Sequence, residues 1–149
     1  MALNLTKVKY ETLNARQQEN YNYQKLSAVL ADYGFVTMRL SDDWKGADLI
    51  AQHIDGETFL KVQLKGRLTL CKKYINKSLH IAFPYRDAWY LYPHDELLEI
   101  IQTNSKRTFP WSNKGEYSVR SPAKQLRQLL NPYLIEPARN RQLKLTLND

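Results

Sequence analysis

Apolar residues recur at two different spacings along this chain, and the first spacing predicts a helix. Within residues 13–33 the apolar side chains stand at i, i+3, i+4 and i+7, as Leu26, Val29, Leu30 and Tyr33. Gly34 then supplies the residue type that most often follows a helix. We expect a strand over 35–40 and a polar loop over 41–46.

The second spacing is an alternation of apolar and polar residues, which predicts a β-hairpin. Its strands are expected over about 48–54 and 57–65, joined by a two-residue turn at Asp55-Gly56. In a hairpin centred on that pair, Asp48 lies opposite Gln63, and Lys65 projects from the same face as Gln63. The other face is apolar and comprises Leu49, Ala51, Leu60, Val62 and Leu64.

The rest of the chain predicts two more strands and two more helices. The strands are expected over 79–83 and 88–92, with a turn at 84–87. The helices are expected from 93–95 through Ile101 and from Ser121-Pro122 to about Leu130, where a serine N-cap precedes a proline. This order predicts an α/β fold with a central mixed β-sheet flanked by helices, in a single domain over residues 1–149.

Composition excludes several classes of protein. Cys71 is the only cysteine, which excludes a disulfide framework and a cysteine-based zinc cluster. The first residues are too short and polar a segment for a signal peptide, and no apolar run approaches the roughly 18 residues of a membrane span. We therefore expect a cytoplasmic protein that has no membrane contact.

The distribution of charge along the chain says more about the partner than the composition does. The formal net charge is +7, and residues 61–86 contain seven basic residues and no acid. Residues 105–127 contain six more basic residues against one acid, Glu116. Basic segments with interleaved Tyr and Trp favour a polyanionic partner such as nucleic acid, and the alternative is a solvated basic surface.

The hairpin motif carries a resemblance to a known group of enzymes. A helix, a strand, Gly46-Ala47-Asp48 at a strand start and then Gln63-x-Lys65 resemble the PD-(D/E)xK nuclease superfamily, which has the restriction-endonuclease-like fold. The resemblance spans roughly residues 15–100. Gln63 stands where the family usually has Asp or Glu, and Ala47 replaces its usual proline. The Gln-x-Lys form looks most like the small group I intron-encoded homing endonucleases of this fold.

The resemblance implies a metal-dependent DNA endonuclease. Asp48, Gln63 and Glu19 match the residues that bind Mg²⁺, for which Mn²⁺ is the expected substitute, and Glu11 is the runner-up to Glu19. Lys65 matches the lysine that completes the catalytic set. Mg²⁺ prefers hard, anionic oxygen ligands, so the neutral amide of Gln63 weakens the expected metal site. The implied partner is double-stranded DNA, bound by a homodimer or homotetramer.

Two basic loops, expected over 66–78 and 102–120, supply the expected contacts with DNA. We assign residues 102–135 to a basic loop and helix that serve DNA contact or oligomerisation, and 136–149 to a loosely ordered tail. The residues expected to bind DNA are Arg67, Lys72, Lys73, Lys77, Lys106, Arg107, Lys114 and Arg120.

Plainer interpretations stay open at this point. Asp48 also suits a turn, Gln63 a sheet surface, and Glu19 the exposed side of a helix. A chain that keeps the fold but no longer cuts would be a DNA-binding module, and the neutral Gln63 favours that alternative. A third possible function is that of a junction-resolving or repair nuclease, which recognises the shape of the DNA rather than its sequence.

Overall fold

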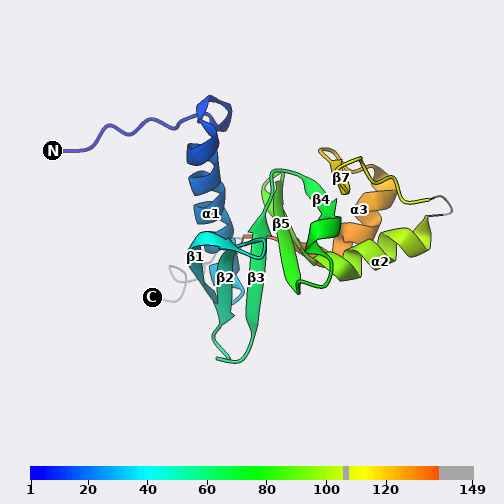
Figure 1. Cartoon of the computed structure of the whole chain (residues 1–149). Coiled ribbons are helices and arrows are strands. Elements are labelled where there is room, and N and C mark those ends of the chain that lie inside the picture. Colours follow the sequence, from blue (N-terminus) through cyan, green and yellow to red (C-terminus); the bar gives the residue numbers. More distant parts are fainter. Residues whose placement is uncertain (106–107, 138–149) are drawn as a thin grey trace, which may run out of the picture.

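A six-stranded sheet with helices on both faces organises the chain (Figure 1). The computed structural model describes residues 1–105 and 108–137, without the side chains of residues 43 and 44. In chain order the elements are η1 Tyr10–Thr12, α1 Ala15–Asp32, β1 Phe35–Trp44, β2 Ala47–His53, β3 Phe59–Leu64, β4 Leu68–Cys71, η2 Lys72–Tyr74, β5 Leu79–Tyr85, β6 Ala88–Pro93, α2 His94–Asn104, β7 Glu116–Val119, α3 Lys124–Leu130, η3 Asn131–Tyr133 and β8 Leu134–Ile135.

The sheet is mixed, as the sequence predicts. Its strand order is β1-β2-β3-β5-β6-β8. β3 and β5 are parallel, and every other neighbouring pair in this sheet is antiparallel. The carboxyl ends of β3 and β5 therefore lie at the same edge of the sheet. β4 and β7 form a separate two-stranded antiparallel ribbon.

The predicted helix is α1, and its apolar stripe covers one face of the hairpin. Leu26, Val29 and Leu30 are buried against a cluster that includes Leu49, Ala51 and Val62. Burial of a leucine side chain stabilises the fold by about 1.5–3 kcal/mol, so this contact orients α1 on the sheet. Tyr33, the last residue of the predicted stripe, is 45% exposed, because the helix ends before it.

The opposite face of the sheet is covered over β5 and β6. Ile81, Phe83 and Tyr92 belong to a second buried cluster, together with apolar residues of α2, α3 and β4. The strands expected over 79–83 and 88–92 are thereby confirmed, each slightly longer than predicted. No helix within residues 1–105 and 108–137 is long and apolar enough to cross a membrane.

The predicted hairpin register is confirmed, but the predicted turn is wrong. Leu49 pairs with Val62, and the pairs continue to Gln52 and Phe59. Residues 54–57 form a four-residue loop, because the carboxylate of Asp55 accepts the backbone N–H groups of Glu57 and Thr58, each at 2.8 Å. A four-residue loop centred on 55 and 56 gives the same register as a two-residue turn.

Other boundaries also differ from the prediction. The expected loop over 41–46 is mostly strand, since β1 continues to Trp44. The expected basic loop over 66–78 contains β4 and η2, because β4 pairs with a distant partner, β7. The last helix starts at Lys124, and its N-cap is Ala123, whose side chain makes no capping hydrogen bond. Ser121, the expected N-cap, therefore lies before the helix.

Candidate active site

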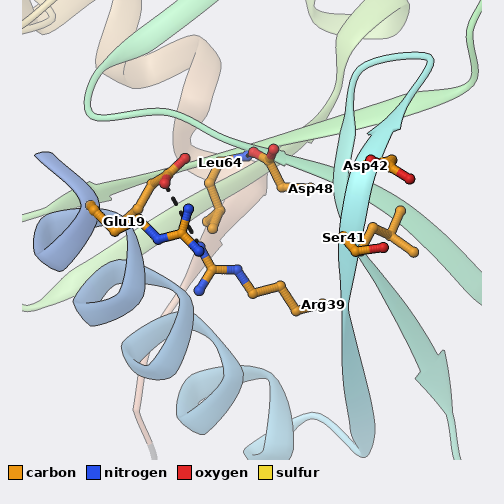
Figure 2. A pocket seen from close by; sticks show the side chains of 8 residues that line it. Glu19, Arg39, Ser41, Asp42, Asp48 and Leu64 are labelled. Atoms are coloured by element: carbon orange, nitrogen blue, oxygen red, sulfur yellow. Dashed lines mark hydrogen bonds and ion pairs between the residues drawn. The ribbon is translucent and has the colours of Figure 1, made fainter.

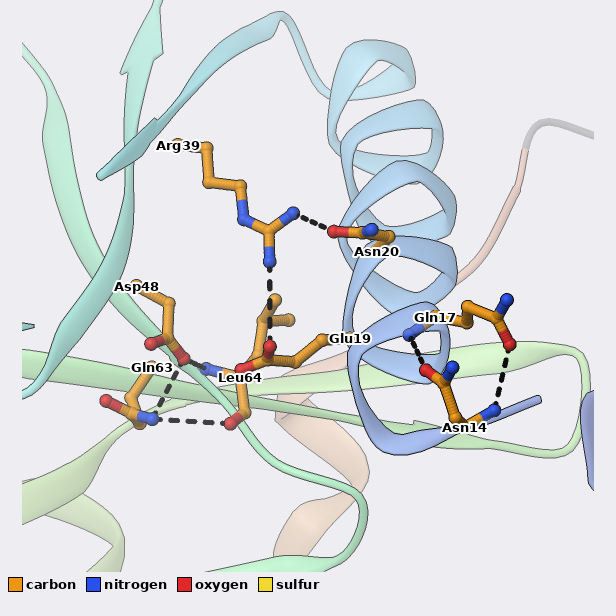
Figure 3. A network of polar contacts seen from close by, with 8 residues as sticks. All are labelled: Asn14, Gln17, Glu19, Asn20, Arg39, Asp48, Gln63 and Leu64. Atoms are coloured by element: carbon orange, nitrogen blue, oxygen red, sulfur yellow. Dashed lines mark hydrogen bonds and ion pairs between the residues drawn. The ribbon is translucent and has the colours of Figure 1, made fainter. Parts of the chain in front are cut away.

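Asp48 lies where the two strands of the hairpin separate. Leu49 with Val62 is the last ladder pair on that side, and beyond it the Asp48 carboxylate accepts the backbone N–H of Leu64 through Oδ2 at 2.8 Å. The same oxygen accepts the side-chain amide of Gln63, also at 2.8 Å (Figure 3). The expected juxtaposition of Asp48 and Gln63 is therefore present, although their roles remain a prediction.

The orientation of the Gln63 amide differs from what metal binding requires. Its Nε2 lies 2.8 Å from Asp48 Oδ2 and 3.4 Å from the Leu64 carbonyl oxygen. A carboxylate and a carbonyl only accept hydrogen bonds, so the atom between them has to be the NH₂ group. The amide nitrogen thus lies between two oxygens, and the amide oxygen of Gln63 would be available to a cation here only after the amide turns over.

The donor set around this point otherwise fits a hard cation. Asp48 offers a carboxylate, Leu64 a backbone carbonyl, and Gln63 an amide oxygen, all of which are oxygen ligands of the kind Mg²⁺ prefers. Among the residues described, no three His, Cys, Asp or Glu side chains cluster in a way that would hold a metal ion. A cation here would therefore depend on neutral oxygens for part of its coordination.

Glu19 reaches the same region from α1. The helix starts one turn earlier with a capping box, in which Asn14 and Gln17 each accept the other's backbone N–H at 2.9 Å. Glu19 and Asp48 line one cleft of about 460 Å³, which we call the α1 cleft (Figure 2). Its other lining residues are Arg16, Arg39, Leu40, Ser41, Asp42 and Leu64.

Arg39 holds the Glu19 carboxylate in the α1 cleft. Its guanidinium lies 3.8 Å from Glu19 Oε2 and donates a hydrogen bond to the side-chain oxygen of Asn20 (Figure 3). Both members of the ion pair are substantially exposed, so the pair contributes little to stability. Its consequence is positional, since Glu19 is held beside Asp48 but shares its charge with an arginine.

Lys65 lies on the other side of Asp48, in a second cleft. This cleft of about 390 Å³, the lysine cleft, is lined by Lys45, Gly46, Asp48, Gln63, Lys65, Lys73, Tyr74 and Lys77. The ammonium of Lys65 lies 5.6 Å from the centroid of the Tyr74 ring, within cation–π range. Burial raises the pKa of the Tyr74 hydroxyl, so the ring is a neutral floor at physiological pH.

The remaining predicted DNA contacts fall into separate groups. Lys73 and Lys77 share the lysine cleft with Lys65. Arg67 and Arg120 are exposed just outside the pair Leu68 with Val119, at one end of the ribbon.

The other end of the ribbon carries the next group. Lys72 packs against Gly115 beside the exposed Lys114, with its ammonium 5.7 Å from the Trp111 ring centroid. Lys106 and Arg107 lie outside the described residues.

Sequence reasoning missed three side chains at this site. The position of Arg39 could have been inferred from the sequence, because Arg39 lies on the same face of β1 as Phe35 and Thr37. That face points toward α1, where Thr37 is hydrogen-bonded to Tyr23 and Ser27. Lys45 and Tyr74 had none, because Lys45 lies in the turn between β1 and β2 and Tyr74 in η2, and only the fold brings these two segments together.

Comparison with known proteins gives remote structural likenesses only. No protein-family model matches the chain, and no curated protein matches its sequence. Among solved structures it is similar to Hjc, a Holliday junction resolvase of Archaeoglobus fulgidus, at 16% identity and a TM-score of 0.48, over 74% of this chain and 87% of that one. It is also similar to the bacterial homing endonuclease I-Ssp6803I, at 14% identity and a TM-score of 0.45, over 75% of this chain and 79% of that one. Any assignment of function therefore depends on the site itself.

Proposed function

We propose that this chain is a Mg²⁺-dependent endonuclease that hydrolyses phosphodiester bonds of double-stranded DNA at specific sites, like the homing endonucleases its motif resembles. The observation that carries the proposal is the meeting of Asp48, Gln63 and the Leu64 carbonyl at one point, next to Lys65. That set combines oxygen ligands for a cation with a fixed positive charge, which is what phosphodiester hydrolysis requires.

The residues present fit Mg²⁺, with one adjustment. When the Gln63 amide turns over, its NH₂ group would leave the space between Asp48 and the Leu64 carbonyl, and its oxygen would become a third ligand beside these two. When bound, the cation would lower the pKa of an attacking water and neutralise charge on the scissile phosphate. Mn²⁺ accepts the same oxygen ligands and is the expected substitute. Glu19 lines the α1 cleft with Asp48, which suits a role through a bound water.

Lys65 is the proposed catalytic cation of the chain itself. Its ammonium stands in the cleft beside Asp48, where it can orient the attacking water and stabilise the charge that develops on the phosphoryl oxygens. Its side chain is half-buried and rests on the Tyr74 ring, so its position is already restricted before substrate binds. A restricted cation loses less conformational entropy on reaching the transition state.

Plasmid cleavage tests this assignment. The wild type, Lys65→Ala and Asp48→Asn are incubated with supercoiled plasmid and Mg²⁺ or Mn²⁺, and DNA affinity is measured alongside. We expect both variants to lose cleavage and to keep DNA affinity within a few fold, because one residue is a small part of the phosphate contacts. Cleavage by Lys65→Ala at the wild-type rate would remove Lys65 from the mechanism. Competition between junction and linear DNA separates a resolving or repair nuclease from a site-specific one.

The second candidate is a DNA-binding module of the same fold that does not cut. The hydrogen bond from Gln63 Nε2 to Asp48 favours it, because that contact satisfies the carboxylate without a metal. This alternative predicts intact plasmid at every Mg²⁺ and Mn²⁺ concentration, together with tight and salt-sensitive DNA binding. Any metal-dependent cleavage that Asp48→Asn abolishes excludes it.

A further inference from the structure

The lysine cleft holds more positive charge than the proposed chemistry uses. Catalysis assigns a role to Lys65 alone, yet Lys45, Lys73 and Lys77 line the same cleft. Asp48 is the only carboxylate among its lining residues in the described chain, and it already accepts two hydrogen bonds. Four lysines against one carboxylate leave a strong local excess of positive charge, which favours an anionic ligand.

Tyr74 is the structural floor of the cleft. Only 3% of it is exposed, and the ammonium groups of Lys73 and Lys65 lie 5.2 Å and 5.6 Å from its ring centroid. The turn that carries Lys45 packs directly on this ring, since a Cβ at Gly46 would stand 3.0 Å from a Tyr74 ring carbon. Gly46, at a φ of +95°, therefore lets the turn that carries Lys45 pack against Tyr74, which places Lys45 in the same cleft as Lys65 and Lys73.

The loop that carries Tyr74 is anchored at both ends to the start of α2. The backbone N–H of Cys71 donates to His94 Nε2 at 3.0 Å, and that of Asn76 donates to Asp95 Oδ2 at 2.8 Å. Because His94 Nε2 accepts, its ring proton is on Nδ1 and is donated to Asp95 Oδ1 at 2.8 Å. Lys72 to Ile75 are thus held in place without a ligand, which lowers the entropic cost of binding one.

We propose that the part of the lysine cleft formed by Lys45, Lys73 and Lys77 is a phosphate-binding site, next to the position proposed for the scissile phosphate at Asp48 and Lys65, that takes a neighbouring phosphodiester of the bound DNA strand. The volume of the whole cleft, about 390 Å³, accommodates a phosphate with its sugar. The site needs no metal, because its charge comes from lysines. The anion site stands on its own geometry, and only the DNA strand as the source of the phosphate rests on the proposed function.

Binding of inorganic phosphate in the presence of a chelator tests the anion site. The affinity is measured by ³¹P NMR for the wild type, for Lys45→Gln/Lys73→Gln and for Lys25→Gln. Lys25 is a matched control, since it is an exposed lysine whose ammonium lies 5.3 Å from a tyrosine ring centroid, that of Tyr21, outside the cleft. We expect the double variant to lose affinity by at least about tenfold, because hydrogen bonds to charged groups contribute strongly, and the control to match the wild type. Equal affinity in all three proteins would overturn the proposal.

The salt dependence of duplex binding identifies the source of the phosphate. The slope of log affinity against log salt reports how many phosphates the protein neutralises, so loss of the one phosphate held in the cleft should make the slope of the double variant smaller by about one. The Lys25→Gln slope should equal that of the wild type. A double variant that loses inorganic phosphate but keeps the wild-type slope would mean that a free anion, not DNA, fills the cleft, which overturns the proposal as stated.

The outcomes separate this inference from the endonuclease assignment. Phosphate binding and the change of slope, without any cleavage by the wild type, would support the phosphate site and contradict the endonuclease function. Cleavage that depends on Asp48 and Lys65, without phosphate binding in the absence of metal, would contradict the proposed phosphate site and support the endonuclease function. Circular dichroism of the double variant checks that its fold is intact, and both substituted lysines are exposed.

Discussion

At the scale of single residues, the amide of Gln63 decides how the site behaves without a metal. Its NH₂ group satisfies Asp48 Oδ2 and lies near the Leu64 carbonyl, so the metal-free chain has no facing carboxylates at this point. The glutamate usual in the family that the motif resembles would place two carboxylates together there. A neutral Gln63 would therefore attract a metal ion less strongly than a carboxylate would. It also leaves the metal-free site without repulsion between two carboxylates.

Gln63→Glu should consequently destabilise the metal-free protein in a pH-dependent way. Two facing carboxylates raise the pKa of the pair above the roughly 4.3 of an unfolded glutamate, so the variant loses stability relative to the wild type as pH rises from about 4. We expect a loss of about 1–3 kcal/mol at neutral pH, measured by urea unfolding in a chelator, and a recovery on adding Mg²⁺.

Gln63→Leu is the control for this prediction. It removes the hydrogen bond to Asp48 without adding a second carboxylate, so its loss of stability should not recover with Mg²⁺. A Gln63→Glu protein as stable as the wild type at neutral pH in a chelator would show that the two side chains do not face each other. The register of the hairpin end would then have to be different.

At the scale of elements, the hairpin loop is fixed by one acidic side chain. Asp55 accepts the Thr58 hydroxyl at 2.6 Å in addition to the two backbone N–H groups, and these hydrogen bonds, the Thr58 hydroxyl first, hold the pKa of its carboxyl well below the usual range. A lowered folded-state pKa means that this contribution is present above the unfolded pKa of about 3.9 and is lost as pH falls through the folded value.

Asp55→Asn should therefore weaken the hairpin at neutral pH and flatten the acid limb of the stability profile. The amide keeps one acceptor oxygen but loses the charge that strengthens the hydrogen bonds. The free energy of unfolding against pH, measured for both proteins, should converge toward low pH. Glu57→Gln is the matched control, since it changes a neighbouring exposed acid. Parallel profiles for wild type and Asp55→Asn would contradict this account of the loop.

The elements also show which parts of the structure a sequence reveals. The hairpin register was predictable because alternation fixes the faces, and any even loop centred on Asp55-Gly56 gives the same pairs. The strand β4 was not, because Leu68 to Cys71 are stabilised by pairing with residues 116–119, far along the chain. Among site residues, Asp48, Gln63 and Lys65 follow from that register, whereas Tyr74 reaches the site only through contacts with α2.

At the level of the whole molecule, each chain offers one set of Asp48, Gln63 and Lys65, which under the proposed function would cut one strand at a time. A double-strand break therefore requires two copies, and we expect a homodimer or homotetramer on a partly palindromic site. Sedimentation of the free and the DNA-bound protein measures the number of chains. A single chain in both states, together with double-strand breaks from single binding events, would contradict the expected assembly.

We propose that Asp48, the Leu64 carbonyl and Gln63 form the metal centre of a nuclease. The most direct measurement is the Mg²⁺ dependence of plasmid cleavage by the wild type, Gln63→Glu and Gln63→Ala. Gln63→Glu should reach half-maximal cleavage at lower Mg²⁺, because it keeps an oxygen ligand and adds a charge, whereas Gln63→Ala should lose most activity. Identical Mg²⁺ dependence and rates in all three proteins would contradict the claim.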